Sequence, residues 1–585
     1  MKKRRALGPD LRRLFTYKEL PIGATSVGLE VDRIKTGIWR FFKPVMMEKT
    51  SPCGESCPAG VPIRRLLTLV GEGKWKEAWE TVLEENPFPG ICGRICDHPC
   101  EVACYRGRFD ESLAIHNVER AVGDYGRNLR AHLPAKGGRR EKIAIVGSGP
   151  SGLSCAYFLR KLGYHPTVFE AFPRPGGTMQ AAIPAYRLPQ QILDQEIDRI
   201  KRLGVKFELN RKLGEDLTFE ELSRYDAVFL SLGAFSDLSF KILGSHLRGV
   251  FGGLDFLKRV KEKRRISLGK RAIVIGGGNT AIDCARTARR LGSSAQIFYR
   301  RTPEEMPASK DEILEAKEEG IPFTFLVSPL KILGKKDRVT GVKFFRNRLG
   351  KKGPDGRRVP VAIKGSYFRC KADSVILALG EESDLEGLPE SIKISNNRVV
   401  IDERGETSLR GFFAGGDMTS LPHTVTHAIA SGKRGALSID LYLKGLDRDL
   451  KPFRIGEKIS LSMRKYLQGG EDPSLHPVVP FEKINLSYFE PEERAEVGSI
   501  SERERQKGFR EVNLGLPRDL TIQEANRCFS CGICNHCDNC LNYCPDTSIL
   551  KMAFNEVDYE YCKGCGICEN ECPVGFIQME KEETA

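Results

Sequence analysis

Ten of the 19 cysteines in this 585-residue chain lie near its C-terminus, between Cys528 and Cys572. Two loops there share the spacing CxxCxxCxxxCP, one starting at Cys534 and one at Cys562. In ferredoxins with two [4Fe–4S] clusters, the first three cysteines of each loop bind one cluster and the fourth binds the other. This register predicts one cluster on Cys534, Cys537, Cys540 and Cys572, and a second on Cys562, Cys565, Cys568 and Cys544.

Two cysteines that precede the first loop, Cys528 and Cys531, are not used as ligands in this register. A competing register exists because CFSCGIC, starting at Cys528, resembles CKGCGIC, starting at Cys562. It would make Cys528, Cys531 and Cys534 the first three ligands, and it would need a longer loop to the fourth. We favour the first register because it keeps the Cys-Pro ending of both loops. A zinc site is the remaining alternative.

Six further cysteines lie between Cys53 and Cys104, in SPCGESCPAGVPI and NPFPGICGRICDHPCEVACYRG. Apolar residues nearby recur at helical spacing, which predicts helices with the cysteines in loops at their edges. Disulfide frameworks are typical of small secreted chains, and the basic start of this long chain is not followed by an apolar run. We therefore expect iron–sulfur ligation in a reducing compartment, the cytoplasm.

A first glycine-rich turn joins an apolar strand to a helix in IAIVGSGPSGLSCAYFLRKLGYHPTVFE. Gly147 permits a tight turn, Gly149 lets a pyrophosphate approach the backbone, and Gly152 lets helix and strand pack closely. Glu170 ends the following strand, where an acidic side chain binds the ribose hydroxyls of a dinucleotide. The segment therefore predicts a dinucleotide-binding unit.

A second unit, RAIVIGGGNTAIDCARTARRLGSSAQIFYRR, predicts NAD(P) contacts from Gly276, Gly278, Asn279 and Thr280. Its second strand ends in Arg300 and Arg301 instead of an acid. An arginine there suits the 2′-phosphate of NADP(H), so NADP(H) is slightly favoured over NAD(H). The alternative is that both arginines only solvate the surface.

The segment TSLRGFFAGGD, which ends at Asp417, resembles the second flavin fingerprint of two-dinucleotide flavoproteins. The resemblance implies that Asp417 binds the ribityl–phosphate region of FAD, and that HTVTHAIASGKRG places a helix N-terminus beside the isoalloxazine. The first unit would then hold FAD, and the second would be an inserted NAD(P)H domain. The FAD contacts so implied are Gly147, Gly149, Pro150, Ser151, Gly152, Glu170, Gly177, Arg187, Gly416, Asp417, Thr424 and Val425.

Disulfide reductases of this fold carry a redox-active cysteine pair close after the first FAD helix. Here Cys155 has no nearby cysteine in the sequence, and Gly176–Pro189 contains none. We therefore expect no dithiol relay, and we expect electrons to leave the flavin through iron–sulfur clusters.

The N-terminal cysteine segments and IHNVERAV resemble the helical iron–sulfur domain of the glutamate synthase small subunit and of dihydropyrimidine dehydrogenase, over about residues 49–450. The resemblance implies one [4Fe–4S] cluster on Cys57, Cys96, Cys100 and Glu119. A cluster bound only by cysteines is the alternative. The second cluster of these relatives needs two more cysteines upstream of Cys53, which this chain lacks. Cys53 and Cys104 alone are too few, so we predict three clusters in all.

Charge and hydropathy limit the remaining possibilities. The net charge of +15 comes from dispersed basic residues without a nucleic-acid-binding motif, so we expect an acidic redox partner and no nucleic acid. No stretch approaches the roughly 18 apolar residues of a membrane span.

The motifs predict an α/β fold: a two-dinucleotide-binding (FAD/NAD(P)) Rossmann-like flavoprotein with an N-terminal helical iron–sulfur domain and a C-terminal ferredoxin-like α+β domain. The predicted order is a basic arm (1–48), the helical domain (49–138), an FAD domain (139–245 and 376–450) interrupted by the NAD(P)H domain (246–375), a linker (451–520) and the ferredoxin domain (521–585).

We expect a soluble oxidoreductase that passes electrons between NAD(P)H and a protein partner through FAD and [4Fe–4S] clusters. The cofactors exchange the hydride, so no catalytic side chain is predicted. In architecture the chain resembles the iron–sulfur flavoprotein that serves dissimilatory sulfite reductase. A 2-oxoacid oxidoreductase, a ferredoxin and a second copy of this chain are other candidate partners. A non-catalytic electron-transfer or scaffold subunit and an electron-bifurcating flavoprotein remain alternatives.

Overall fold

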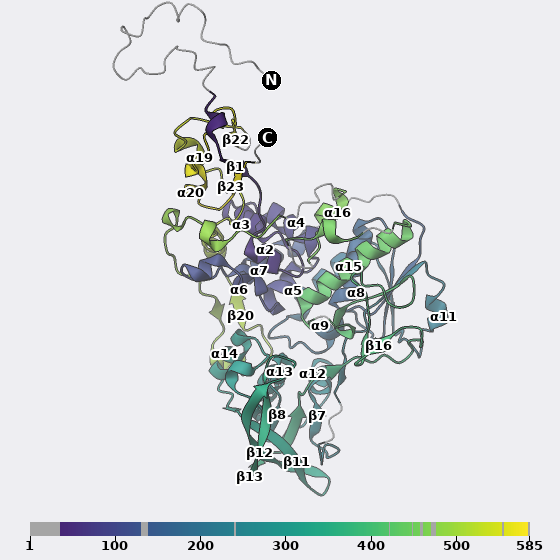
Figure 1. The fold of residues 1–585 in the computed structure, drawn as a ribbon. Helices are drawn as coiled ribbons and strands as arrows, with labels where there is room; N and C mark the ends of the chain where they lie inside the picture. The colour runs from purple at the N-terminus through teal and green to yellow at the C-terminus, as the bar shows by residue number, and fades with distance from the viewer. Residues whose placement is uncertain are drawn as a thin grey trace, which may run out of the picture.

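The computed structural model describes residues 35–129, 138–238, 242–420, 422–446, 449–456, 460–469, 476–552 and 555–582. The part of the predicted basic arm before residue 35 lies outside these ranges. In Figure 1 the C-terminal elements stand at the top, the helices of residues 52–125 lie below them, and two parallel sheets fill the right and the bottom. None of the described helices is long and apolar enough to cross a bilayer.

The first parallel sheet has the strand order β18-β5-β2-β3-β4. Strands β18, β5 and β2 are short, wholly apolar and buried, as expected where a sheet is covered on both faces. Helices α8 (Pro150–Lys161) and α15 (Val425–Leu443) pack together against it. The strands are β2 (Ile143–Val146), β3 (Thr167–Glu170), β4 (Lys206–Leu209), β5 (Ala227–Leu230) and β18 (Phe412–Ala414).

The second parallel sheet, β10-β9-β8-β14-β7, is inserted in the chain between β5 and β18, as the resemblance implied. Strand β14, the last of these strands along the chain, ends at Leu377, two residues beyond the predicted end of the NAD(P)H domain at residue 375. The strands are β7 (Val250–Gly252), β8 (Arg271–Ile275), β9 (Ser294–Phe298), β10 (Phe323–Thr324) and β14 (Ser374–Leu377). Its helices are α12 (Gly253–Lys261), α13 (Asn279–Arg290) and α14 (Lys310–Glu318).

A three-stranded antiparallel sheet packs on this domain, with Phe298 of the parallel sheet stacked on Phe344 at 4.4 Å between ring centroids. Its strands are β11 (Val327–Lys335), β12 (Arg338–Lys352) and β13 (Arg358–Lys371). The chain passes from the first parallel sheet to the second and later returns. The two connecting segments pair as antiparallel strands, β6 (Ser236–Asp237) with β15 (Glu381–Glu382). Smaller elements of the flavin-type domain are α9 (Gly177–Ala181), α10 (Gln190–Arg202), α11 (Phe219–Leu222), β16 (Ile394–Ser395) and β17 (Arg398–Val399).

The N-terminal cysteine region is helical, and its core is continuous with the core under α8 and α15. Lys433 of α15 fixes this contact, because its ammonium group lies 2.5 Å from the Glu85 carboxylate and donates to the carbonyl oxygens of Ala59 and Leu461. The helices are α2 (Pro52–Ser56), α3 (Ile63–Gly71), α4 (Trp75–Glu85), α5 (Pro89–Ile95), α6 (Pro99–Val102) and α7 (Ile115–Tyr125).

The two ends of the chain exchange elements. Strand β1 (Phe42–Met46), which falls in the predicted arm, pairs antiparallel with β23 (Ile577–Lys581) and so completes the C-terminal domain. In return α18 (Arg518–Asn526) packs on α3 and α7 of the N-terminal helical domain. The predicted linker wraps around these parts as short pieces: α16 (Met463–Leu467), β19 (Gly498–Ser499), α17 (Glu502–Arg505) and β20 (Asn513–Gly515). The C-terminal domain adds α19 (Asn539–Asn542), β21 (Ile549–Leu550), β22 (Glu556–Val557) and α20 (Ile567–Asn570).

Candidate functional site

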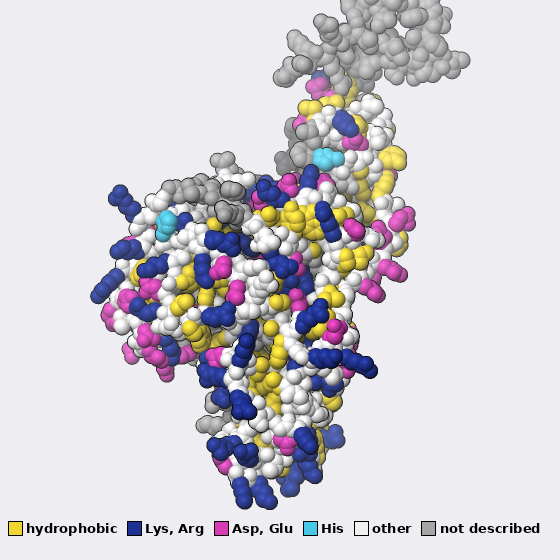
Figure 2. Space-filling view, turned by 180° about the vertical axis from the view of Figure 1, so that it is seen from behind, with side chains coloured by type: hydrophobic (Ala, Val, Ile, Leu, Met, Phe, Trp, Pro, Cys, Tyr) yellow, Lys and Arg dark blue, Asp and Glu magenta, His cyan; other side chains and the backbone are white. Residues whose placement is uncertain are grey.

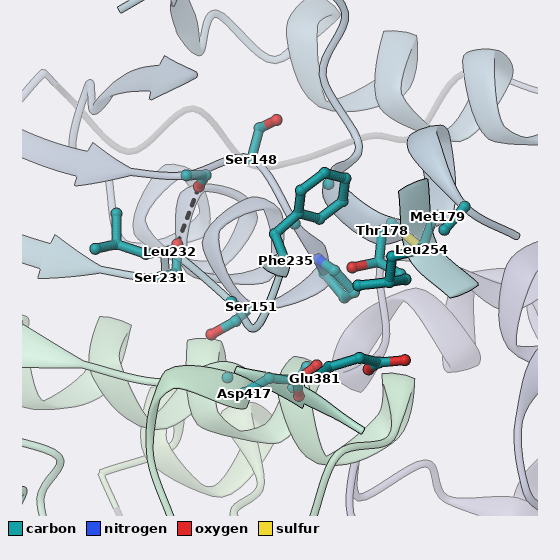
Figure 3. Close-up of a pocket in the computed structure, with 18 of the residues that line it drawn as sticks. Ser148, Ser151, Thr178, Met179, Ser231, Leu232, Phe235, Leu254, Glu381 and Asp417 are labelled. Atoms are coloured by element: carbon teal, nitrogen blue, oxygen red, sulfur yellow. Dashed lines mark hydrogen bonds between the residues drawn. The ribbon is translucent and has the colours of Figure 1, made fainter. Parts of the chain in front are cut away.

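A cavity of about 610 Å³ lies where the two parallel-sheet domains meet (Figure 3). All the residues predicted to bind FAD line it except Gly152. A Cβ atom at Gly152 would lie 2.0 Å from the carbonyl oxygen of Gly147, so this glycine lets the helix pack tightly on the turn. The predicted residues that line the cavity are Gly147, Gly149, Pro150, Ser151, Glu170, Gly177, Arg187, Gly416, Asp417, Thr424 and Val425.

The N-terminus of α8 is built to receive a pyrophosphate. Its N-cap is Gly149, so no capping side chain occupies the free N–H groups of the first turn. A Cβ atom at Gly149 would meet nothing within 4 Å, which leaves room for a ligand against the backbone. Free N–H groups at the positive end of a 12-residue helix favour an anion.

Glu170 lies at the end of β3, on the wall of the cavity. Its carboxylate accepts hydrogen bonds from the backbone N–H groups of Ser148 and Phe172, each at 2.9 Å. The Ser148 hydroxyl also donates to it. These bonds hold the carboxylate beside the glycine turn, where a ribose attached to the pyrophosphate would lie.

Asp417 and Thr424 form the opposite wall. Figure 3 shows Asp417 beside Glu381, below Ser151. Burial raises the pKa of Asp417 to about 6, and the Arg398 guanidinium offsets part of this effect. Thr424 caps α15, because its hydroxyl oxygen accepts from the backbone N–H of His427 at 3.3 Å. The donor set therefore fits FAD.

The second glycine turn reaches the same cavity through Asn279 and Thr280, at the start of α13. The Thr280 hydroxyl donates to Glu381 at 2.7 Å. Gly276 has a φ of +154°, and a Cβ atom there would lie 2.1 Å from the carbonyl oxygen of Ala378. Gly278 is the N-cap of α13 without a side-chain bond, so this helix also presents free N–H groups for an anion.

The two arginines after β9 have different surroundings. Arg301 is 5% exposed, donates to the carbonyl oxygen of Arg358 at 2.8 Å and pairs with Asp355 at 3.4 Å. Arg300 is exposed. Of the two, only Arg300 presents its guanidinium to solvent, where a 2′-phosphate could pair with it.

Arg187 also lines the cavity, but its guanidinium pairs with two acids of the inserted domain. It lies 2.7 Å from Asp283 of α13 and 2.5 Å from Glu312 of α14. Arg187 therefore links the two nucleotide-binding units, and its charge is already matched by carboxylates.

The ligands implied for the N-terminal cluster are the C-cap residues of α2 and α5, one residue of α6 and one of α7. Burial raises the pKa of the Cys57 thiol to about 11, and the nearby Glu119 carboxylate adds to the shift. Glu119 accepts a hydrogen bond from the Asn86 amide at 2.8 Å, and burial raises its pKa to about 8. The Cys96 thiol lies close to Cys57 and Glu119, and the Cys100 thiol lies close to Cys57 and Cys96.

The cluster site adjoins the cavity. Ile95 and Asp97, on either side of Cys96, both line the 610 Å³ cavity. Cys92 is buried in α5, also close to Glu119 and Cys96. The N-terminal iron–sulfur site and the proposed flavin site therefore share a wall.

At the C-terminus the structure brings together the cysteines of the favoured register. Cys534, Cys537, Cys540 and Cys572 line one small cavity of about 20 Å³. Burial, together with the neighbouring thiols of Cys562 and Cys565, raises the pKa of Cys568 to about 12. Lys563 lies near the thiols of both Cys565 and Cys544. This arrangement is the one that crossed fourth ligands require.

The spacing of the sulfur atoms differs from that of a zinc site. Four thiolates on one zinc ion lie about 3.8 Å apart, because each Zn–S bond is about 2.3 Å. In the described residues, the one group of three potential ligand atoms within 4.8 Å of one another is His98, Glu101 and His116. The cysteine sets are wider, which favours clusters over single ions.

Sequence reasoning did not predict several other residues that line the 610 Å³ cavity. Phe235 and Phe172 lie with ring centroids 5.0 Å apart, and the Lys258 ammonium group lies 4.4 Å from the Phe172 centroid. Glu381 directly follows Gly380 in DSVILALGE, and this strand-then-glycine pattern was a usable signal. The two phenylalanines carried no pattern in the sequence that marked them.

Comparison with known families gives three matches. Residues 141–432 match the pyridine nucleotide-disulphide oxidoreductase family. Residues 46–131 match dihydropyrimidine dehydrogenase domain II with its 4Fe-4S cluster, and residues 555–578 match a 4Fe-4S binding domain. The predicted fold class, with iron–sulfur domains on both sides of a two-dinucleotide flavoprotein, is thereby confirmed.

Individual relatives are similar over most of their length. The NADP(+)-dependent formate dehydrogenase subunit beta of Moorella thermoacetica is 36% identical, over 84% of this chain and 71% of that protein. The NADPH-Fe(3+) oxidoreductase subunit beta of Geobacter sulfurreducens is 35% identical, over 82% and 75%. The glutamate synthase (NADPH) small chain of Halomonas elongata is 34% identical, over 67% and 88%. Among solved structures, Mycobacterium tuberculosis FprA in complex with NADPH aligns at 19% identity with a TM-score of 0.46, over 66% of this chain and all of that one.

Proposed function

Because the chain belongs to the pyridine nucleotide-disulphide oxidoreductase family, we propose that it is the NADPH-oxidising subunit of a redox complex. It delivers electrons to a protein partner through FAD and [4Fe–4S] clusters. The proposal rests on the observation that the groups for both nucleotides and for one cluster border a single cavity. The N-termini of α8 and α13 and the residues flanking Cys96 all meet in the 610 Å³ cavity.

FAD bound there would take a hydride from a nicotinamide and release the electrons singly to an iron–sulfur cluster. The chain's own part is binding and placement. The α8 turn and Glu170 would hold the pyrophosphate and a ribose of FAD, while Asp417 and Thr424 would hold its other end. Asn279 and Thr280 would direct the nicotinamide toward the same space. Cys155, buried inside α8, takes no part in this route.

NADPH rather than NADH is proposed because Arg300, directly after β9, is exposed to solvent. The names of two relatives, which specify NADP(+) and NADPH, support the same choice. An arginine–phosphate contact is worth about 1.5–3 kcal/mol, or roughly a 10- to 100-fold difference in affinity.

The partner is proposed to be a redox enzyme that this chain supplies with electrons. A formate dehydrogenase-type subunit is one candidate, from the name of a relative, and dissimilatory sulfite reductase or a 2-oxoacid oxidoreductase is another, from the resemblance of the motifs. The net charge of +15 favours an acidic docking face. Figure 2 shows Lys and Arg spread over one side of the molecule, with a concentration on the inserted domain at the bottom of the view.

Anaerobic mixing with each nicotinamide tests the proposal. NADPH should bleach the flavin absorbance at a concentration well below that of NADH. Arg300→Ala should raise the NADPH concentration needed for half-maximal reduction by about 10- to 100-fold, because the 2′-phosphate contact is lost. The NADH requirement should stay unchanged.

The matched control is Lys335→Ala, which removes an exposed cation of the same domain at the end of β11 that is remote from Arg301 and β9. It should change neither requirement. If neither NADPH nor NADH reduces the flavin, the chain is a passive electron-transfer or scaffold subunit and the proposal fails.

A further inference from the structure

Four cysteines that the three sequence-predicted clusters leave unused lie together in the structure. Cys53, Cys104, Cys528 and Cys531 line one small cavity of about 20 Å³. Two of them come from the N-terminal cysteine region, and two come from a segment more than 400 residues further along the chain. Sequence spacing gave them no common site, because neither pair contains enough ligands alone.

The four thiols are enclosed by the protein. Cys53, Cys104 and Cys531 are each 9% exposed, and Cys528 is partly buried. The apolar side chains of Leu67, Leu113 and Phe529 line the same cavity around them. Four cysteine side chains gathered in one buried pocket match the ligand number of a thiolate-bound metal centre.

Secondary structure positions Cys53 and Cys104, and side-chain and backbone contacts position Cys528 and Cys531. Cys53 is in α2, and Cys104 directly follows the short turn of α6. Arg527 anchors the loop with Cys528 and Cys531 to the helical domain. Its guanidinium donates to the carbonyl oxygen of Glu111 at 2.9 Å and pairs with Asp110 at 3.3 Å. The backbone N–H of Lys49 donates to the Gly532 carbonyl oxygen at 2.8 Å, so the two chain segments run side by side.

Two guanidinium groups face the same cavity. Arg64 and Arg106 both line it together with the four cysteines. The buried Nε atom of Arg64 has no hydrogen-bond partner in the described part of the chain. An unsatisfied buried N–H is unfavourable unless an acceptor group lies beside it. A thiolate-ligated iron–sulfur cluster is such a group.

We propose that Cys53, Cys104, Cys528 and Cys531 bind a fourth [4Fe–4S] cluster, held jointly by the two ends of the chain. Four thiolates are the usual ligand set of such a cluster. A single zinc ion fits less well, because no three of these sulfur atoms lie within 4.8 Å of one another in the described residues. The fourth cluster explains why Cys528 and Cys531 precede a ferredoxin loop that is complete without them.

The position of this cluster connects the other iron–sulfur sites. Its ligand Cys53 lies in α2, four residues before Cys57 of the first N-terminal site, and its ligand Cys104 lies four residues after Cys100 of α6. On its other side Cys531 is three residues from Cys534, a ligand of the ferredoxin pair. The cluster would accept one electron from its neighbour on the flavin side and pass one electron on, with no change in bonded atoms. This relay rests on the proposed function, whereas the metal content does not.

Metal analysis of the intact protein tests the site directly. Anaerobically purified full-length protein should contain about 16 iron and about 16 sulfide per FAD, against about 12 of each for three clusters. The double variant Cys528→Ser/Cys531→Ser should lose about four irons and keep its flavin. NADPH should still bleach that flavin at an unchanged rate, which shows that the variant is folded.

A second pair of substitutions and a control make the result specific. Cys53→Ser/Cys104→Ser should lose the same four irons, and combining both pairs should cost no further iron. Cys370→Ser, a partly buried cysteine of β13 outside all the sites, should keep about 16. A wild-type content of about 12, unchanged iron in both double variants, or about one zinc per chain in place of four irons would overturn the proposal.

Discussion

Asp417 ends the turn after β18 with its carboxylate inside the cavity, and burial raises its pKa to about 6. An ionised carboxylate can accept two hydroxyl hydrogen bonds from a flavin, and the protonated form has lost acceptor capacity. Because FAD is expected to bind the ionised form of Asp417, its binding at a pH below the Asp417 pKa must first remove the proton from that carboxyl group. We therefore expect the FAD affinity of flavin-free protein to be constant above about pH 7 and to fall about tenfold by about pH 5.

Fluorescence titration of flavin-free protein between these pH values measures this effect. Asp417→Asn should bind FAD more weakly at pH 7 and should lose the pH dependence. The exposed Asp384→Asn, at the rim of the same cavity, is the control and should keep it. A pH-independent wild-type affinity would show that Asp417 does not contact the flavin as an anion.

Glu119 is the predicted carboxylate ligand of the N-terminal cluster, and it lies inside the helical domain rather than on its surface. Glu119→Ala should remove about four irons per chain, because no other carboxylate of α7 can replace the ligand. Glu119→Gln should keep the iron and shift the reduction potential of the cluster, since an amide oxygen is a neutral donor. Iron analysis and a redox titration measure both effects.

Cys92→Ser is the control for Glu119. Cys92 is 1% exposed and lies next to Glu119 and Cys96, outside the implied ligand set. We expect this variant to keep its iron. If Cys92→Ser loses the cluster and Glu119→Ala keeps it, the site is bound only by cysteines.

At the scale of elements, Lys433 of α15 joins the flavin-type domain to the helical iron–sulfur domain. Its side chain is 1% exposed, and its ammonium group pairs with Glu85, which also accepts from the Ser462 hydroxyl and the Met463 N–H. Lys433→Met leaves a buried carboxylate without its cation. It should destabilise the contact between the domains by about 3–5 kcal/mol.

The urea concentration at which flavin and cluster absorbance are lost measures this change. The matched control is Lys451→Met, whose partner Asp449 lies 3.4 Å away with both side chains more than half exposed. Exposed pairs contribute about 0–1 kcal/mol, so the control should shift the midpoint little. Equal shifts in the two variants would contradict a structural role for the buried pair.

How far sequence reasoning reached depended on how local each signal was. The glycine turns, Glu170 and the ferredoxin loops are local patterns, and the structure places them in the predicted surroundings. Arg301 had an equally good pattern, yet Asp355 and the Arg358 carbonyl oxygen hold it in a structural role. Those partners are more than 50 residues away and no spacing rule connects them.

Pairing between the chain ends was also beyond the sequence. Phe42–Met46 is a short segment containing a proline, and it becomes a strand only because Ile577–Lys581 lies beside it. The cavity shared by Cys53 and Cys528 depends on the same arrangement, since α18 packs on α3. Tertiary contacts of this range override local propensity and carry no periodicity.

At the scale of the whole molecule, the sites form one series. Figure 1 shows the C-terminal domain at the far end from the inserted nucleotide-binding domain, with the helical domain between them. The cavity adjoins Cys96, the helical domain carries both N-terminal cysteine sets, and Cys534 follows Cys531 by three residues. In the proposed function, electrons from NADPH cross this series and leave from the C-terminal domain.

The measurement that tests this most directly is rapid anaerobic mixing with NADPH, followed by freeze-quenching and electron paramagnetic resonance. We expect bleaching of the flavin to be followed by reduced-cluster signals, including the coupled signal of the two neighbouring C-terminal clusters. Protein with Cys562→Ser should bleach equally and lose the coupled signal. Bleached flavin with every cluster still oxidised in the wild-type protein would contradict the account.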